Sequence, residues 1–460
     1  MFVVVLRRTR CRYCLCALCV FLSENLLDKF TSMALYSPMQ VEQLGVDDRN
    51  PSSSFEREAI VRDLRRIGQN RQASQMTTSS KDQRQRISRP TAKSRESPEM
   101  SDKDRIFVIG GAGCIGSHCC KGLAESGYQP VCFDNFSTGH RASVKWGSMI
   151  EGSIHDQSLL KSSIEQHRPV AVLHFAASSL VSESVSNPEK YYRNNVEGTL
   201  SLLRAMRQAG CKTIVFSSSG AVYGQSHQGL ICESEQPRPV NPYGRTKWMI
   251  EQILTDFQEA YGIQPICLRY FNASGADPSG EIGEDHHPET HLIPRALMAI
   301  HGRVSDFAIY GDDYDTADGT PVRDYVHVTD LAHAHVLAVK HLLSGGEGGC
   351  FNLGTGQGYS VRQILEQIHA ETSQSVPSVV RERRAGDPPV LVADPARARA
   401  ILGFQPQYSD ISTIVRTAWN WHRKLHSRAR TKKMSVSEAR PTVNHRPTRS
   451  TETPDTASST

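Results

Sequence analysis

The stretch Ile106-Phe-Val-Ile-Gly110-Gly-Ala-Gly-Cys-Ile-Gly116 joins a short apolar run directly to a cluster of glycines. Ile106 to Ile109 is a continuous apolar run of the kind that is buried in a parallel sheet. The glycines allow a tight turn in which the backbone approaches a bound group closely, and a helical stretch follows to Gly127. The positive end of such a helix suits a pyrophosphate. The stretch therefore predicts a strand, a phosphate-binding turn and a helix.

A second apolar run, from Pro130 to Phe133, predicts the next strand, and Asp134 stands at its end. A carboxylate at this position can accept hydrogen bonds from both ribose hydroxyls of an adenosine, which favours NAD over NADP. A glycine triplet alone is weak evidence for a nucleotide site. Strand, glycines, helix, strand and acid in this order and spacing predict a dinucleotide-binding site.

The alternation of strands and helices continues through the next hundred residues. Strands are expected over Val170 to Phe175 and Thr213 to Phe216, with a helix between them that carries Asn194 and ends near Gly210. Repeated βαβ units predict an α/β protein with a doubly wound parallel sheet, whose ligands bind at the carboxyl ends of the strands. Three serines follow the second of these strands and are candidates for the site, although a serine there can also cap a helix: Ser217, Ser218 and Ser219.

The stretch Asn241-Pro-Tyr-Gly-Arg-Thr-Lys247 predicts the start of a long helix. Pro242 suits a first helical turn, because its missing N–H costs no hydrogen bond there. Tyr243 and Lys247 are four residues apart and project from one helix face. The ammonium favours the phenolate and lowers the tyrosine pKa, so Tyr243 can act as a base, with Ser219 placed to meet it. In isolation, a tyrosine and a lysine that merely share a helix face are the simpler interpretation.

Together these motifs resemble the extended short-chain dehydrogenase/reductase superfamily and, within it, the UDP-glucose 4-epimerases. The resemblance covers residues 104–424 and includes Tyr270-Phe-Asn272, Val322-Arg-Asp-Tyr-Val-His-Val328 and Arg384-Ala-Gly-Asp387. It implies a Rossmann-type doubly wound parallel sheet, a smaller C-terminal lobe that binds a UDP-sugar, and a tightly bound NAD.

The resemblance also implies an isomerase that interconverts UDP-glucose and UDP-galactose. In this family Tyr243 takes the proton of the sugar 4-hydroxyl while the C4 hydride passes to NAD, the 4-keto sugar turns over, and the hydride returns to its other face. Lys247 lowers the tyrosine pKa and holds the nicotinamide ribose, and Ser219 shuttles the proton. Tyr243, Lys247 and Ser219 are therefore the expected catalytic residues.

Two sets of binding residues are implied in the same way. The residues expected at NAD are Gly110, Gly113, Cys114, Ile115, Gly116, Asp134, Asn135, Ile154, Phe175, Ala176, Ala177, Asn194, Ser217, Tyr243, Lys247 and Tyr270. The residues expected at the UDP-sugar are Ser219, Asn272, His291, Leu292, Tyr310, Arg323, Arg384 and Asp387. Arg323 and Arg384 resemble the family's diphosphate clamp, in which planar guanidinium groups suit phosphate oxygens.

Some positions depart from the family pattern. Cys114 stands where better-known members have a tyrosine, and Ser153 replaces an aspartate that contacts adenine. Ser179 stands where some members have lysine, and His291 where some have asparagine. Leu391 occupies a position whose size is associated with acceptance of N-acetylated sugars, and its middling bulk leaves that substrate class undecided.

The predicted organisation has four parts. Residues 1–102 are expected to be a disordered or dispensable extension, with Met100 as the expected start of the functional protein and a targeting or regulatory tail as the alternative. Residues 103–272 form the NAD-binding domain, to which 315–361 return. Residues 273–314 and 362–424 form the UDP-sugar lobe. A last helix is expected over Ile411 to Trp421, and residues 425–460 are expected to be a disordered tail.

Charge and cysteine content limit the class of protein. Residues 1–100 and 427–460 together hold 24 of the 53 Lys and Arg residues but 14 of the 48 Asp and Glu residues, so the middle of the chain is mildly acidic. That balance argues against nucleic-acid binding by the folded part. The twelve cysteines show no extracellular disulfide framework, which favours a reducing compartment. We expect a cytoplasmic protein without a membrane span, and a homodimer as in the family.

Rival functions remain open. Another UDP-sugar, such as UDP-arabinose/xylose, UDP-glucuronate or a UDP-N-acetylhexosamine, would use the same groups, and an idle NAD-binding scaffold is a minor alternative. A 4,6-dehydratase needs an acid/base pair beside the serine, where this chain has Gly220 and Ala221. A metal site is conceivable at His286, His287 and His291 with Glu284 and Asp285, but the family chemistry needs none and none is expected.

Overall fold

The structure is a computed structural model that describes residues 104–224, 229–384 and 386–438, with side chains as far as residue 427. The expectations for residues 1–102, including the start at Met100, lie outside these residues. The predicted tail beyond residue 438 lies outside them too.

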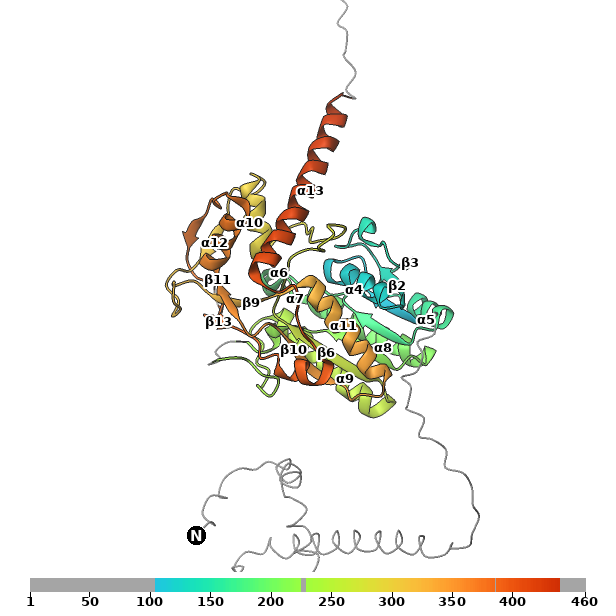
Figure 1. The fold of residues 1–460 in the computed structure, drawn as a ribbon. Helices are drawn as coiled ribbons and strands as arrows, with labels where there is room; N and C mark the ends of the chain where they lie inside the picture. The colour runs from blue at the N-terminus through green and yellow to red at the C-terminus, as the bar shows by residue number, and fades with distance from the viewer. Residues whose placement is uncertain (1–103, 225–228, 385, 439–460) are drawn as a thin grey trace, which may run out of the picture. The chain divides into compact units, whose positions relative to one another are not determined.

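A seven-stranded parallel sheet forms the centre of the larger lobe, in the order β10-β6-β5-β4-β1-β2-β3 (Figure 1). Its strands are β1 (Arg105–Ile109), β2 (Gln129–Asp134), β3 (Ser148–Glu151), β4 (Ala171–His174), β5 (Thr213–Ser217), β6 (Gln264–Tyr270) and β10 (Gly349–Leu353). The strand order reverses between β1 and β4, and ligands of open α/β sheets bind at such a switch point. The expected Rossmann-type sheet is confirmed.

Helices cover both faces of this sheet. One layer contains α4 (Cys114–Glu125) and α11 (Val328–Leu343), and the other contains α5 (Gln157–His167), α8 (Gly198–Ala209) and α9 (Pro242–Tyr261). Side chains of strand β1 pack into both layers, because successive side chains point to opposite faces of a sheet. Ile106 and Val108 pack into the α4 and α11 layer, whereas Phe107 and Ile109 pack into the other.

The helix that carries Tyr243 begins and ends as its sequence predicts. The Asn241 side chain caps α9 by accepting a hydrogen bond from the Gly244 N–H at 2.9 Å, and Pro242 occupies the first turn. Gly262 ends the helix in the left-handed conformation, with φ of 69°. The start of α9 is therefore held firmly, one residue before Tyr243.

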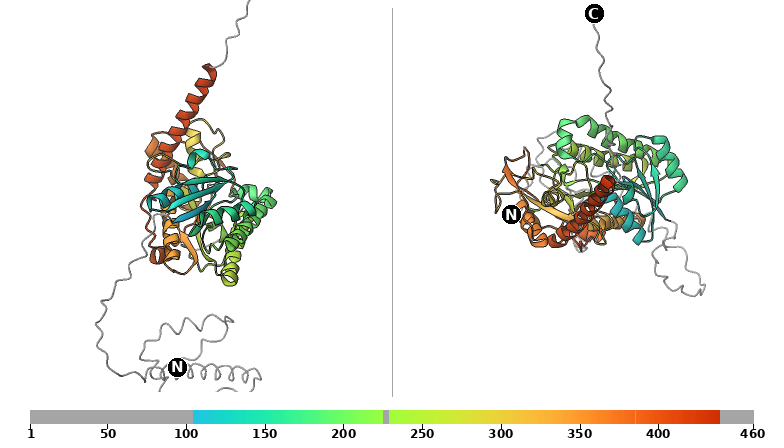
Figure 2. Two further views of the ribbon diagram at one scale, coloured as in Figure 1. Left: turned by 90° about the vertical axis from the view of Figure 1, so that its right-hand side faces the viewer. Right: turned by 90° about the horizontal axis from the view of Figure 1, so that it is seen from above.

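Short strands and helices build the smaller lobe (Figure 2). Strand β9 (Val322–His327) pairs with β7 (Asn272–Ser274), β11 (Gly358–Ser360) and β13 (Val390–Leu391). Strand β8 (Ala308–Tyr310) pairs with β12 (Val379–Arg381). A separate apolar core joins helices α10 (Leu292–Ile300), α12 (Val361–Thr372) and α13 (Ile411–Glu438). The domain boundaries predicted from the sequence stay a prediction.

Two helices differ from the sequence-based expectation. The single helix expected to end near Gly210 is divided into α7 (Pro188–Tyr191), a π-helical segment (Tyr192–Glu197) and α8. Helix α13 continues to Glu438, so the helix end predicted at Trp421 is wrong. The tail boundary predicted at residue 425 stays a prediction. The added turns hold three Arg and three Lys residues, which favour helix even without apolar periodicity.

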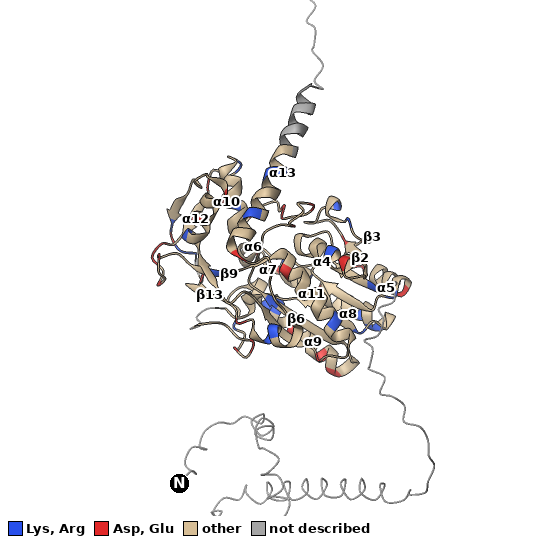
Figure 3. Cartoon of the chain, in the orientation of Figure 1, with Lys and Arg blue, Asp and Glu red and all other residues tan. Residues whose placement is uncertain are grey.

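The remaining helical segments are short. They are Arg141–Ser143, α6 (Val181–Ser186), Gly220–Val222 and Ala398–Leu402. Figure 3 shows Lys and Arg residues interspersed with Asp and Glu residues over both lobes. Among the described residues, no helix combines the length and the apolar character that crossing a membrane requires.

Candidate active site

The glycine turn between β1 and α4 leaves no room for side chains. A Cβ on Gly116 would lie 2.2 Å from the Gly110 carbonyl oxygen, and one on Gly110 would lie 2.6 Å from the Ala176 nitrogen. Gly110 also has a φ of 81°, which L side chains rarely adopt. Gly113 precedes α4 without a side-chain cap, so the N–H groups of the first turn are left for a ligand. This cradle fits a pyrophosphate.

Asp134 is held at the carboxyl end of β2, beside the glycine turn. Its Oδ2 accepts a hydrogen bond from the Ala112 N–H at 2.9 Å, and its Oδ1 accepts one from the Phe136 N–H at 2.7 Å. A carboxylate has about four acceptor positions, so two remain for a ribose. The carboxylate is therefore fixed in direction and still able to bind the adenosine end of NAD.

Ser219, Tyr243 and Lys247 come together at the carboxyl end of β5. The Ser219 hydroxyl lies close enough to the Tyr243 phenol to lower its pKa. Lys247 is buried, and its Nζ donates to the Ser217 carbonyl at 2.7 Å and lies 5.8 Å from the centre of the Tyr243 ring. The structure thus brings the three expected catalytic residues into one group.

Burial sets the ionisation of this group in the ligand-free chain. It raises the pKa of Tyr243, against the opposing effect of the Ser219 hydrogen bond. It lowers the pKa of Lys247 to about 7, against the opposing effect of Glu251. In the chain without NAD, loss of hydration therefore raises the Tyr243 pKa and does not lower it, and the expected effect of Lys247 stays a prediction.

A buried polar network that the sequence analysis missed supports the group. Glu251 accepts from Arg269 at 2.9 and 2.6 Å and from the Ser218 hydroxyl at 2.5 Å. Glu251 lies four residues after Lys247 and eight after Tyr243, so the helical spacing already placed all three on one face. The network ties helix α9 to the ends of β5 and β6. Ser218 is thus a structural partner of Glu251 and not a helix cap.

Asn195 is a second residue that the sequence analysis did not single out. Its Oδ1 accepts from the Ser178 N–H at 2.8 Å, and its Nδ2 donates to the Ser178 carbonyl at 3.1 Å and to the Thr246 hydroxyl at 3.0 Å. It therefore links the loop after β4 to helix α9 beside Lys247. Asn194, which was expected at NAD, donates from its Nδ2 to the Asn195 Oδ1 at 3.0 Å.

The other residues expected at NAD lie around the same edge of the sheet. Phe175 and Ala176 follow β4, and the backbone N–H groups of both donate to the Ile109 carbonyl. The Ser217 hydroxyl hydrogen-bonds the phenol of Tyr270. Burial, reinforced by the charges of Glu284 and Glu289, raises the pKa of the Cys114 thiol. The remaining members lie at the start of α4, after β2, after β3 and after β4: Ile115, Asn135, Ile154 and Ala177.

Four residues expected at the substrate form two contact pairs in the smaller lobe. Arg323 donates from Nη2 to the Asp387 carboxylate at 2.5 Å, across 64 residues of sequence. The guanidinium of Arg384 lies 4.1 Å from the centre of the Tyr310 ring. Strand pairing explains both contacts, because β13 lies beside β9 and β12 lies beside β8. Asn272 begins β7, the fourth strand of this region.

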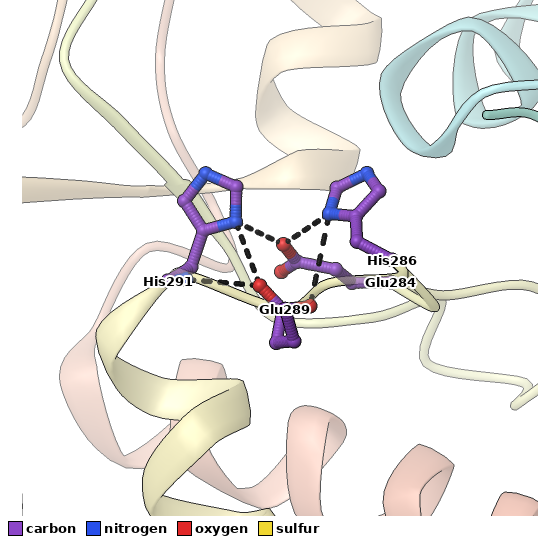
Figure 4. Close-up of side chains that lie close together, drawn as sticks. All are labelled: Glu284, His286, Glu289 and His291. Atoms are coloured by element: carbon purple, nitrogen blue, oxygen red, sulfur yellow. Dashed lines mark hydrogen bonds and ion pairs between the residues drawn. The ribbon is translucent and has the colours of Figure 1, made fainter. Parts of the chain in front are cut away.

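His291 and Leu292 begin helix α10, and His291 also belongs to a second group of polar side chains (Figure 4). We call Glu284, His286, Glu289 and His291 the His–Glu cluster. One possible ligand atom from each residue lies within 4.8 Å of the others. Burial opposes ionisation of Glu284, but His291 and His286 outweigh it and lower the pKa of this carboxyl. Glu289 had not been considered from the sequence, whereas Asp285 and His287, which had, lie outside the cluster.

Comparisons with known proteins agree with this geometry. A family model described as "NAD dependent epimerase/dehydratase family" matches residues 106–354. A UDP-glucose 4-epimerase from Rhizobium leguminosarum bv. trifolii is 50% identical over 321 residues, which cover 70% of this chain and 98% of that protein.

Two solved structures agree in the same way. The UDP-glucose 4-epimerase from Brucella ovis in complex with NAD has a TM-score of 0.68 and 56% identity, covering 69% of this chain and 97% of that one. The UDP-glucose-4-epimerase from Stenotrophomonas maltophila with bound NAD and formylated UDP-arabinopyranose has a TM-score of 0.69 and 37% identity. The match covers 71% of this chain and 99% of that one. The chain therefore belongs to the NAD-dependent epimerase/dehydratase family and, within it, to the UDP-glucose 4-epimerases.

Proposed function

We propose that this protein interconverts UDP-glucose and UDP-galactose by transient oxidation of the sugar at C4 with a resident NAD. The observation that carries the proposal is the meeting of Ser219, Tyr243 and Lys247 at the carboxyl end of β5. That edge of the sheet also carries the glycine turn and Asp134. A base and a dinucleotide cradle at one edge suit an alcohol oxidation.

The residues that would hold NAD fit it well. Gly110 and Gly116 let the backbone of the turn pack tightly, the first turn of α4 has no side-chain cap, and Asp134 keeps acceptor positions for a ribose. When bound there, NAD supplies a hydride acceptor and, after the sugar turns over, a hydride donor. The net redox change is zero, so the reaction is an isomerisation.

In this mechanism Tyr243 removes the proton of the sugar 4-hydroxyl, and Ser219 hydrogen-bonds that oxygen and relays the proton. A free tyrosine titrates near 10, so ionisation near neutral pH requires about 4 kcal/mol of differential stabilisation. Burial works against it in the ligand-free chain. The Lys247 ammonium and the positive charge of the nicotinamide are the sources of that stabilisation in the proposal. Tyr243 is then active as a base only in the loaded enzyme.

The smaller lobe would hold the nucleotide. Arg323 and Arg384 supply guanidinium groups for the diphosphate, and Asp387 supplies a carboxylate for the uridine ribose. Arg323 and Asp387 hold each other in place through their ion pair, and its partly buried position protects the pair from solvent screening. Asn272, His291 and Leu292 complete the proposed contacts with the UDP-sugar.

A direct test uses the full-length chain purified without added cofactor. Nucleotide released by denaturation is identified, and native protein is incubated with UDP-galactose while UDP-glucose is measured. We expect NAD in the protein and conversion without added NAD. Bound NAD without conversion would assign the same machinery to another UDP-sugar. A chain that binds no NAD would contradict the proposal.

A second substrate class is favoured by one comparison. The Stenotrophomonas maltophila structure holds a UDP-arabinopyranose derivative, and chemistry at C4 does not require a particular group at C6. A panel with UDP-arabinose, UDP-xylose, UDP-glucuronate and UDP-N-acetylglucosamine at equal concentrations gives the order of kcat/KM. A UDP-hexose that ranks first supports the main proposal, and a pentose that ranks first replaces it.

The proposal includes a homodimer in the cytoplasm. Large apolar side chains are exposed along α6 and α9, including Val185 at 66% and Met249 at 37%. These helices contact each other, so the exposed side chains belong to one region of the surface. Eight free cysteines among the described residues suit a reducing compartment. Light scattering of the full-length chain measures its mass, and a monomer at micromolar concentration would contradict the homodimer.

A further inference from the structure

The His–Glu cluster occupies a loop between β7 and α10. Its carboxylates are nearly fully buried, with side-chain exposures of 8% for Glu284 and 3% for Glu289. The imidazoles are partly exposed, at 31% for His286 and 47% for His291. Figure 4 shows both rings turned toward the two carboxylates from opposite sides. The reaction proposed above uses neither carboxylate.

The possible ligand atoms of the cluster lie within 4.8 Å of one another, and the recorded separations lie on both sides of the spacing around a small metal ion. His286 Nδ1 lies 3.0 Å from the nearer Glu284 oxygen and 3.7 Å from Glu289. His291 Nδ1 lies 2.5 Å from Glu284 and 3.1 Å from Glu289. Around a tetrahedral zinc ion with bonds of about 2.1 Å, neighbouring ligand atoms lie about 3.4 Å apart. Small side-chain rotations would therefore complete the coordination shell.

The backbone of the loop is anchored from several sides, which holds the four residues close together. The Trp421 indole donates from Nε1 to the Glu284 carbonyl at 2.8 Å, and a Cβ on Gly283 would lie 2.6 Å from the same ring. The Glu289 Oε1 accepts from the N–H groups of Thr290 and His291 at 2.7 and 2.9 Å. The other Glu289 oxygen lies 3.7 Å from His286 Nδ1. Hydrogen bonds of this kind orient ligand residues before an ion binds.

The negative charge of the two carboxylates also favours binding of a cation. Two buried carboxylates carry two negative charges, and burying such charges without a partner is costly. Within the described residues, the ion pairs recorded for Glu284 and Glu289 come only from His286 and His291. A divalent ion would balance the two charges.

We propose that Glu284, His286, Glu289 and His291 bind one divalent transition metal ion, for which Zn²⁺ suits the donor set best. Two imidazoles select against Mg²⁺ and Ca²⁺, which prefer oxygen ligands alone. Four protein ligands complete a tetrahedral shell, as in structural zinc sites. The ion would cross-link the loop and hold the start of α10, where His291 is followed by Leu292. This inference goes beyond the proposed epimerase reaction, which needs no metal.

Zn²⁺ binding to the full-length chain tests the proposal. Cys11, Cys14, Cys16 and Cys19 are first replaced by serine in every protein, because closely spaced thiols also bind zinc. In this background we compare Glu284→Gln and His286→Asn with the matched control His287→Asn. His287 is adjacent, has the same side chain, is 73% exposed and lies outside the cluster.

We expect one tightly bound Zn²⁺ per chain, by equilibrium dialysis against a competing chelator, in the background protein and the His287→Asn control. Loss of a residue that only orients a ligand costs about 10- to 100-fold in affinity. Glu284→Gln and His286→Asn should therefore weaken binding by at least about 100-fold. Equal binding by all proteins, or none by any, would overturn the proposal and leave a cluster of ion pairs with protonated histidines.

The electronic spectrum of Co²⁺ bound to the background protein gives a second measurement, which holds even where a variant fails to fold. A site of two imidazoles and two carboxylates gives cobalt d–d bands without thiolate-to-metal charge transfer. A thiolate band would place the ion at a cysteine and overturn the assignment. Neither measurement uses turnover, so failure of this inference and failure of the proposed reaction are distinguishable.

Discussion

Tyr243 is the residue on which the proposed chemistry depends. Its side chain is half-buried, lies close enough to Ser219 for that hydroxyl to lower its pKa, and meets the edge of the Tyr191 ring, with the ring centres 6.5 Å apart. Loss of hydration raises the pKa of the phenol, and a nearby positive charge would favour its ionised form. The surroundings of Tyr243 therefore link the activity of the base to occupancy of the cofactor site.

Tyr243→Phe should lower kcat by about 100- to 10,000-fold, the usual contribution of a positioned acid or base. The bound NAD and the melting temperature should stay within error, because the ring and its packing are retained. Tyr261→Phe, on the same helix and 44% exposed, is the matched control and should keep full activity. Equal turnover by Tyr243→Phe and the control would show that another group is the base.

Asp134→Asn should weaken NAD retention by about 10- to 100-fold, since hydrogen bonds to a charged group contribute about 1.5–3 kcal/mol. The substitution keeps the shape of the side chain but replaces one acceptor oxygen with a donor. NAD content after gel filtration measures the effect. Glu151→Gln changes an exposed carboxylate on the neighbouring strand β3 and should retain NAD. Equal NAD content in both variants would remove Asp134 from the cofactor site.

At the scale of elements, the β1 turn and helix α4 act as one unit. Gly116 lies in the first turn of α4 against the Gly110 carbonyl, whereas Gly122 lies two turns later against side chains only. The two glycines share a helix but differ in what surrounds them. They make a matched pair for testing whether the turn tolerates any side chain.

Gly116→Ala should destabilise the protein by about 1–3 kcal/mol and abolish NAD retention, because the new methyl would lie 2.2 Å from a backbone oxygen that cannot retreat easily. Gly122→Ala meets its nearest atoms at 3.7 Å and should be neutral or add up to about 1 kcal/mol of helix stability. Denaturant unfolding and NAD content check both. A stable, NAD-loaded Gly116→Ala protein would disprove the tight turn.

At the scale of the whole molecule, several histidines are buried without charge. Burial lowers the pKa of His174 and His327 to about 3 and of His118 and His335 to about 4. An unfolded histidine titrates near 6.5. Below that pH these histidines bind protons in the unfolded chain but stay neutral in the folded chain. Their contribution to the free energy of unfolding is therefore present above pH 6.5 and is lost as the pH falls toward the folded pKa values.

His174→Gln should therefore flatten the fall of unfolding free energy between pH 6.5 and 5. His174 accounts for about 1.6 kcal/mol over this interval, because the unfolded histidine is half protonated at pH 6.5 and the slope approaches about 1.4 kcal/mol per pH unit below it. Glutamine does not titrate and can keep the hydrogen bond that His174 Nε2 makes with the Thr199 hydroxyl at 2.9 Å. Denaturant unfolding at several pH values measures the slope, with the exposed His287→Gln as control. Equal slopes in the variant and the parent would contradict a neutral buried His174.

Local chemistry explains what the sequence by itself determined. The apolar run, the glycines and Asp134 lie within thirty residues of one another, and their turn and strand signals act over short distances. The four-residue spacing of Tyr243 and Lys247 likewise follows from helix geometry alone. These signals were sufficient for the parallel sheet, the cofactor edge and the expected catalytic residues, all of which lie together in the structure.

Only the tertiary structure decided the contacts between distant segments. Arg323 and Asp387 meet because β13 pairs with β9, and Glu251 meets Arg269 because α9 packs beside β6. The His–Glu cluster depends on the path of its loop, which brings Glu289 inward and leaves His287 exposed. Side-chain direction in an irregular loop has no fixed period, so no sequence pattern could separate His286 from His287. Packing of the loop against Trp421 and helix α10 determines that His286 lies in the cluster and His287 outside it.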